Sequence, residues 1–115
     1  MRRSTSIAAL VTSCVLALPV LMSAPAAAQY GPDTCRQGYV WREAFAGDHV
    51  CVRWWQRAQA ASDNAMGPAR IYGNGRCFEG YVWRESYPGD HVCVTPETRA
   101  RVARDNARAP YRFAY

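Results

Sequence analysis

Residues 35–52 read CRQGYVWREAFAGDHVCV, and residues 77–94 read CFEGYVWRESYPGDHVCV. The two stretches are offset by 42 residues and are identical at 13 of their 18 positions. The correspondence continues further along the chain, because the triplet DNA at residues 63–65 returns at residues 105–107. A sequence that repeats itself at a fixed interval predicts two copies of one structural unit, packed side by side.

Each copy predicts a β-hairpin. The β-forming residues of GYVWRE at 80–85 predict a first strand, and HVCV at 91–94 predicts the return strand. Pro88 followed by Gly89 is typical of a type II turn between them. The first copy has the same pattern, with Gly47 at the place of Gly89.

A four-residue turn also predicts the register of the second hairpin. In that register Glu85 faces Val92, and two residues earlier Trp83 faces Val94. Because side chains alternate between the faces of a strand, one face is expected to be the core face, with Tyr81, Trp83, Val92 and Val94. The other face is expected to carry Arg84, His91 and Cys93. Trp41 takes the corresponding core position in the first copy.

A helix is expected after each hairpin. Residues 95–97 read TPE, which supplies a cap residue, a first-turn proline and an acid near the positive end of a helix. The helix is expected to continue through residues 98–107, and its counterpart through residues 56–65. The first copy lacks the start signal, because Arg-Trp-Trp stands at residues 53–55.

The amino terminus predicts export. Residues 1–28 have the form of a secretory signal peptide, with Arg2 and Arg3 before an apolar run and three alanines at the expected cleavage site after Ala28. The apolar run is too short for a stable membrane anchor, so no membrane span is expected after cleavage. The expected location is secreted or periplasmic.

The cysteines predict a disulfide framework. Cys14 leaves with the signal peptide, and four cysteines remain at positions 35, 51, 77 and 93. An exported chain meets an oxidising compartment, in which these thiols can pair. Three connectivities are possible. We expect Cys35–Cys51 and Cys77–Cys93, because each repeat then closes its own loop, worth about 3 kcal/mol in the chain-entropy estimate.

Together these features predict an α+β fold: a small disulfide-stapled domain of two tandem β-hairpin–helix repeats. A chain of this size has a marginal core without such staples. The expected order is a signal peptide, a lead segment, repeat 1, a linker and repeat 2, at residues 1–28, 29–34, 35–72, 73–76 and 77–115.

The most conspicuous charged cluster is Arg42, Glu43, Asp48 and His49, which recurs 42 residues later. A carboxylate beside a histidine could support acid–base chemistry. We expect a structural role instead, in which the aspartate holds the turn and Arg pairs with Glu across the strands. The chain has no serine or cysteine at a recurring position that the disulfides would leave available as a nucleophile, so no enzyme activity, catalytic residue or cofactor is expected.

Metal binding is the alternative function. His49 and Cys51 lie two residues apart on one strand, hence on one face, and the same holds for His91 and Cys93. With the remaining cysteines, His49 and His91 could form a zinc site. The spacing matches no known zinc pattern, so no metal site is expected as the first choice.

A contact surface is the leading functional hypothesis. Trp54 and Trp55 are adjacent, so they cannot both face one core, and exposed aromatics suit stacking on sugar rings. Arg101, Arg104 and Arg108 form a basic stripe on one helix face. Removing two signal-peptide arginines from the 14 basic residues leaves 12 against 9 acids. This mild positive charge in an exported chain favours a cell-wall polymer or an envelope protein as partner over nucleic acid.

The pattern GYVWREA, then GDHVCV, then a helix closing on DNA, resembles a repeat of small exported bacterial proteins that have no assigned function. The resemblance covers about residues 31–112. It implies a bacterial, exported repeat protein and no particular activity. Residues 53–55 depart from it, because the repeat usually has Thr-Pro-like residues there.

Overall fold

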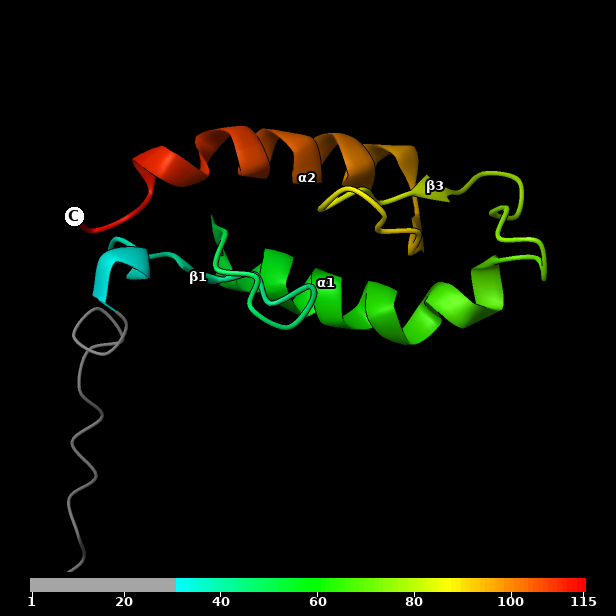
Figure 1. The fold of residues 1–115 in the computed structure, drawn as a ribbon, viewed down its shortest axis with the longest axis horizontal. Coiled ribbons are helices and arrows are strands. Elements are labelled where there is room, and N and C mark those ends of the chain that lie inside the picture. Colours follow the sequence, from blue (N-terminus) through cyan, green and yellow to red (C-terminus); the bar gives the residue numbers. More distant parts are fainter. Residues whose placement is uncertain (1–30) are drawn as a thin grey trace, which may run out of the picture.

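The computed structural model describes residues 31–115. The expected signal peptide, its cleavage site and Cys14 lie outside these residues. Within them the fold is α+β, as predicted: two antiparallel hairpins, each followed by a helix (Figure 1).

The two repeats have matching elements. In repeat 1, β1 (Val40–Trp41) pairs with β2 (Cys51–Val52), and α1 (Trp54–Met66) follows. A short 3₁₀ helix, η3 (Gly67–Arg70), extends α1, and another, η2 (Gly31–Asp33), precedes the repeat.

In repeat 2, β3 (Val82–Trp83) pairs with β4 (Cys93–Val94), followed by α2 (Pro96–Arg108) and η4 (Ala109–Tyr111). The Thr95 hydroxyl accepts a hydrogen bond from the Thr98 amide, which confirms the predicted cap. α1 begins two residues earlier than expected, at Trp54, and each helix ends one residue later than expected, at Met66 and at Arg108.

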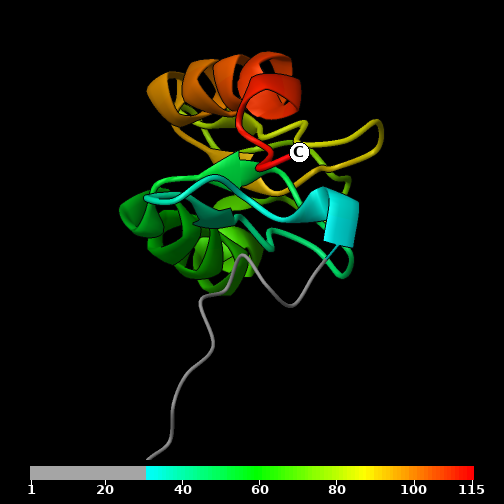
Figure 2. The ribbon, with the colours of Figure 1, turned by 90° about the vertical axis from the view of Figure 1, so that its left-hand side faces the viewer.

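The helices run antiparallel, with the start of α1 at the same end as the end of α2 (Figure 1). Viewed from the side, the hairpins lie between the two helices (Figure 2). This arrangement gives the domain an approximate internal two-fold symmetry that relates each residue to the one 42 positions later.

The disulfides join Cys35 to Cys51 and Cys77 to Cys93, with a Cα–Cα distance of 5.6 Å in both, as predicted. The chain folds back at Gly38 and Gly80, and this brings Cys35 and Cys77 next to the return strand of their own repeat. The φ angles of the two glycines, +93° and +88°, lie in the left-handed region that favours glycine.

The predicted register is wrong by one residue. Val82 pairs with Val94 and Trp83 with Cys93, and the Arg84 amide donates to the Val92 carbonyl. The reason is Glu85, whose φ of +53° ends the strand early and brings it into the turn. Glu43 does the same in the first hairpin, at +51°.

The shifted register changes the core. Val52, Val94 and the cysteines of β2 and β4 are fully buried, joined by Ala60 and Val102 of the helices. Trp83, which was expected in the core, is 37% exposed. Its indole N–H donates to the Gly75 carbonyl, as that of Trp41 does to Asp33. The tryptophans therefore cover the edge of the hairpins instead of filling the centre.

Each repeat is completed by the tail of the other. Ile71, at the end of repeat 1, forms a β-bridge with Cys77 of repeat 2. In return, Phe113 at the end of repeat 2 forms a β-bridge with Cys35 of repeat 1. The chain therefore closes on itself, and its last residues belong structurally to its first repeat.

Candidate functional site

The recurring aspartates hold the hairpin turns. Asp48 is buried and accepts hydrogen bonds from Arg42, at 2.7 Å from Nε and 3.1 Å from Nη2. It also accepts from the backbone amides of Ala44 and Val50, at 3.0 and 3.3 Å. A carboxylate with four donors around it is a structural anchor, and this confirms the expected turn role of the aspartate.

Asp90 repeats this arrangement with one addition. Arg84 Nε lies 2.7 Å from Asp90 Oδ2, and the Ser86 hydroxyl donates to the same oxygen. Burial alone would raise the pKa of Asp90. The hydrogen bonds from Arg84 and Ser86 and the charge of Arg84 outweigh it and hold the pKa below its ordinary value of 3.8.

The glutamates do not pair with these arginines, so the expected cross-strand Arg–Glu pair is wrong. Glu43 instead pairs with Arg57 of α1, and Glu85 pairs with Arg99 of α2 at 2.6 Å. The left-handed conformation of Glu43 and Glu85 aims their side chains toward the helix of their own repeat.

The buried arginines also join the two repeats, a role that the sequence analysis missed. Arg42 Nη1 donates to Asn106 at 2.8 Å, and Arg84 Nη1 donates to Asn64 at 2.8 Å. Each asparagine in turn donates to a turn carbonyl of its own repeat, such as that of Ala44. The recurrence of the DNA triplet was the available signal for these contacts.

The tails are held in the same reciprocal way. Arg70 Nη1 donates to the Cys93 carbonyl at 3.3 Å, and Arg112 Nη1 donates to the Cys51 carbonyl at 3.0 Å. Each of these arginines also pairs with an aspartate of its own helix, Asp63 or Asp105.

Each histidine stacks on the tryptophan of its own hairpin, of which Trp41 is half-buried and Trp83 exposed. The ring centroids of His49 and Trp41 are 3.7 Å apart, and those of His91 and Trp83 are 3.9 Å apart. His49 Nδ1 also lies 3.0 Å from a carboxylate oxygen of Asp33.

Neither histidine belongs to a metal-ligand cluster in the described part of the chain. No group of three or more His, Cys, Asp or Glu side chains that could hold a metal ion occurs among residues 31–115. The four cysteines that the alternative zinc site required are joined in disulfides. The alternative involving His49 and His91 therefore loses its thiolate ligands.

Two residues of the predicted contact surface, Trp55 and Arg101, are in contact. The Arg101 guanidinium lies over the Trp55 ring, 4.9 Å from its centroid, and so links α2 to the start of α1. Trp54 is 73% exposed and Trp55 44% exposed. Arg104 and Arg108 are exposed, and within residues 31–115 no carboxylate forms an ion pair with any of the three arginines.

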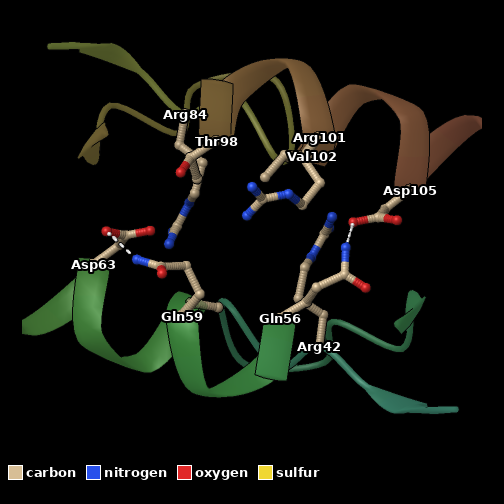
Figure 3. Close-up of a pocket in the computed structure, with 10 residues that line it drawn as sticks. Arg42, Gln56, Gln59, Asp63, Arg84, Thr98, Arg101, Val102 and Asp105 are labelled. Atoms are coloured by element: carbon tan, nitrogen blue, oxygen red, sulfur yellow. Dashed lines mark hydrogen bonds between the residues drawn. The ribbon is translucent and has the colours of Figure 1, made fainter. Parts of the chain in front are cut away.

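A small cavity lies next to this surface, between α1 and α2 (Figure 3). Its lining consists of residues related by the internal symmetry, such as Arg42 with Arg84 and Asp63 with Asp105. The space for the centre of a water-sized molecule is about 20 Å³, which is room for roughly one water. Binding of a larger partner must therefore use the exterior of the domain.

The comparisons with family models, with curated proteins and with solved structures each return no match. The resemblance to exported bacterial repeat proteins therefore stays a prediction. Over residues 31–115, none of the helices has the length and apolar character needed to cross a membrane.

Proposed function

We propose that the protein is a non-catalytic binding module that acts outside the cytoplasm and holds an anionic cell-wall polymer. Its contact surface consists of Trp54, Trp55, Arg101, Arg104 and Arg108, called here the Trp–Arg surface. The observation that carries the proposal is the Arg101–Trp55 contact, which places an aromatic ring beside a guanidinium group that has no ion-pair partner among residues 31–115.

These two groups suit one kind of ligand. The flat face of an indole packs against the C–H face of a sugar ring, and a guanidinium donates two parallel hydrogen bonds to a carboxylate or phosphate. A glycan that carries acidic groups at intervals offers both partners. The two disulfides are typical of an oxidising compartment outside the cytoplasm, where such polymers occur.

The remaining charged residues support a binding role over a catalytic one. The buried aspartates are engaged with arginines and turn amides, and the histidines are stacked on indoles. These side chains serve the scaffold. The Trp–Arg surface instead leaves its polar groups available to a partner.

The test is co-sedimentation with an insoluble anionic glycan, cross-linked polygalacturonate, beside uncharged cross-linked dextran. We expect retention on the first only, falling steeply with salt because ionic contacts are screened. The double change Trp54→Ala with Trp55→Ala should weaken retention at least tenfold, and Arg104→Gln with Arg108→Gln several-fold.

Tyr72→Ala is the matched control, since Tyr72 is also an exposed aromatic residue but follows η3, beyond the carboxyl end of α1, whereas Trp54 and Trp55 begin α1. It should leave retention unchanged. Equal retention on dextran, or an equal loss in the Tyr72 variant, would contradict the proposal.

A further inference from the structure

Two guanidinium groups lie over Tyr39 of repeat 1, whereas among the described residues one lies over its counterpart in repeat 2, Tyr81. The guanidinium groups of Arg53 and Arg112 both lie over the Tyr39 ring, 4.2 and 5.0 Å from its centroid. Arg53 Nη1 also donates to the Gly38 carbonyl at 3.2 Å. Repeat 1 thus contains a guanidinium site built from an aromatic ring and a backbone carbonyl, filled by its own Arg53.

Repeat 2 keeps the ring and the carbonyl but lacks the occupant. Only Arg70, the counterpart of Arg112, lies over Tyr81 among the described residues, at 4.8 Å. The position of Arg53 is taken by Thr95, whose hydroxyl is used to cap α2.

The surroundings of the glycines beside the two rings differ in the same way. A Cβ atom added at Gly38 would lie 3.0 Å from Arg53 Nη1, whereas one added at Gly80 would have no atom within 4 Å. The space that Arg53 fills in repeat 1 is therefore open in repeat 2, and Gly80 is exposed.

The charges around the open place have changed in the direction that favours a cation. Repeat 1 has Arg36 and Gln37 before its glycine, and repeat 2 has Phe78 and Glu79. Together with the exchange at Thr95, this changes the charge at these positions from +2 to −1, and Arg76, which stands where repeat 1 has Thr34, brings the sum at the open place to zero. The open place therefore carries two fewer positive charges than its counterpart, which favours a cation there.

Two arginines also border the region. Arg76 and Arg99 line a shallow groove that includes Tyr81. Arg99 is neutralised by Glu85 at 2.6 Å, whereas Arg76 has no ion-pair partner among residues 31–115. Arg70, which lies over the Tyr81 ring, is paired with Asp63. Of these three arginines Arg76 alone is expected to oppose a cation, so a change at Arg76 can test the sign of the ligand.

We propose that the open place on Tyr81, together with the Gly80 carbonyl, binds a guanidinium group: an arginine side chain of a partner protein. Arg53 on Tyr39 is the internal example of the complex. Arginine fits better than lysine, because its planar, weakly hydrated guanidinium stacks on a ring while its N–H groups reach a carbonyl. The mature chain is itself basic, which disfavours a second copy as the source. This site is separate from the Trp–Arg surface and does not depend on it.

The test is a titration of the oxidised protein with N-acetyl-arginine amide, followed by NMR at the Tyr81 ring and the Gly80 amide. We expect saturable shifts there and none at Tyr39, with binding at least threefold weaker for N-acetyl-lysine amide. The absence of saturable shifts at Tyr81, or equal binding of the two probes, would overturn the proposal.

Exchanging residues between the repeats gives the sharpest variants. Thr95→Arg supplies repeat 2 with the occupant of repeat 1, so it should abolish probe binding. Arg53→Thr should open the site on Tyr39 and raise the stoichiometry from one to two. Both exchanges install a residue that the same fold already carries at the equivalent position. A Thr95→Arg variant that is folded by circular dichroism and binds as the original does would refute the proposal.

Arg76→Gln separates a cation site from an anion site in the same groove. Removal of this charge should tighten guanidinium binding about twofold or more. Weaker binding after this change would contradict a cation site. Shifts at Tyr81 that depend on protein concentration without probe would assign the place to a second copy and overturn the choice of partner.

Discussion

The two repeats share a skeleton and differ on their surfaces. Both have the same disulfide, the same left-handed glutamate, and the same buried Arg–Asp pair, at Arg42 with Asp48 and at Arg84 with Asp90. Most of their differences lie where a side chain reaches the exterior, most clearly where Arg53 of repeat 1 is replaced by Thr95 in repeat 2. Ser86 in place of Ala44 and Val102 in place of Ala60 are buried exceptions.

The difference teaches which residues the fold requires. The positions that the copies share are those that tie the repeats together or hold their turns. The positions at which they disagree supply Trp54, Trp55 and Arg101 to the Trp–Arg surface, and leave Tyr81 open where Tyr39 is covered. The shared residues therefore build the scaffold, and we look for function where the copies diverge.

The largest expected effect comes from breaking the buried ion pair in either repeat. Arg42→Ala and Arg84→Ala each leave a buried aspartate without its counter-charge, so each should lower the free energy of unfolding by about 3 to 5 kcal/mol. Urea unfolding followed by tryptophan fluorescence measures this. A loss below about 1 kcal/mol for either variant would contradict this, because the buried aspartate of that repeat would then not depend on its arginine.

The disulfides come next. Replacing both cysteines of one bridge by serine should cost about 3 kcal/mol, and the cost should be the same in both repeats because the two closed loops have equal length. The comparison of the 35/51 variant with the 77/93 variant is made by urea unfolding under non-reducing conditions. Unequal losses would mean that the repeats differ in more than their surfaces.

Much of this skeleton could be predicted, because its signals are local. Pro88 and Gly89 predict the turn, and the sequence TPE at residues 95–97 predicts the start of α2. The spacing of the cysteines favours one bridge per repeat. The register could not be predicted in the same way. It depends on Glu43 and Glu85 adopting positive φ, and nothing in their type or neighbours indicates that conformation.

Burial of arginine was also beyond prediction. Arginine side chains are usually exposed, because burial of their charge costs free energy. Arg42 can be buried because Asp48 supplies the counter-charge and Asn106 of the other repeat accepts a hydrogen bond. For the candidate site, adjacency of Trp54 and Trp55 implied exposure. The contact of Trp55 with Arg101 depends on how the helices pack, which no local pattern encodes.

A smaller effect is expected where the two turns differ by one hydroxyl. Ser86→Ala gives the second turn the residue of the first, Ala44, and removes a hydrogen bond to the buried carboxylate of Asp90. We expect a loss of about 1.5 to 3 kcal/mol at neutral pH, measured by urea unfolding.

The pH dependence has a definite sign. The pKa of Asp90 is lower in the folded state than in the unfolded chain, so its stabilising effect is full above the unfolded pKa. It is lost as the pH falls from about 4 through the lowered folded pKa. Since Ser86 helps to lower that pKa, the Ser86→Ala variant should lose less stability between pH 5 and 3. An unchanged acid profile would contradict this role of the hydroxyl.

The smallest expected effect is at the asparagines that join the repeats. Asn64→Ala and Asn106→Ala each remove one contact between repeats and one contact to a turn, at positions that water can reach. Each should cost about 1 kcal/mol. A double-mutant cycle with Arg84 should give a coupling energy for Asn64 and none for Asn106. Coupling of Arg84 to both asparagines would show that the contacts between the repeats are not two separate arginine–asparagine pairs.

The central claim is that the tail of each repeat holds the other repeat. Native-state hydrogen exchange of two matched variants, Arg112→Ala and Arg70→Ala, tests it most directly. Arg112 belongs to repeat 2 but donates to Cys51 of repeat 1, and Arg70 belongs to repeat 1 but donates to Cys93 of repeat 2. We predict that each change lowers amide protection mainly in the hairpin of the other repeat. Loss of protection confined to the repeat that carries the change would contradict the account.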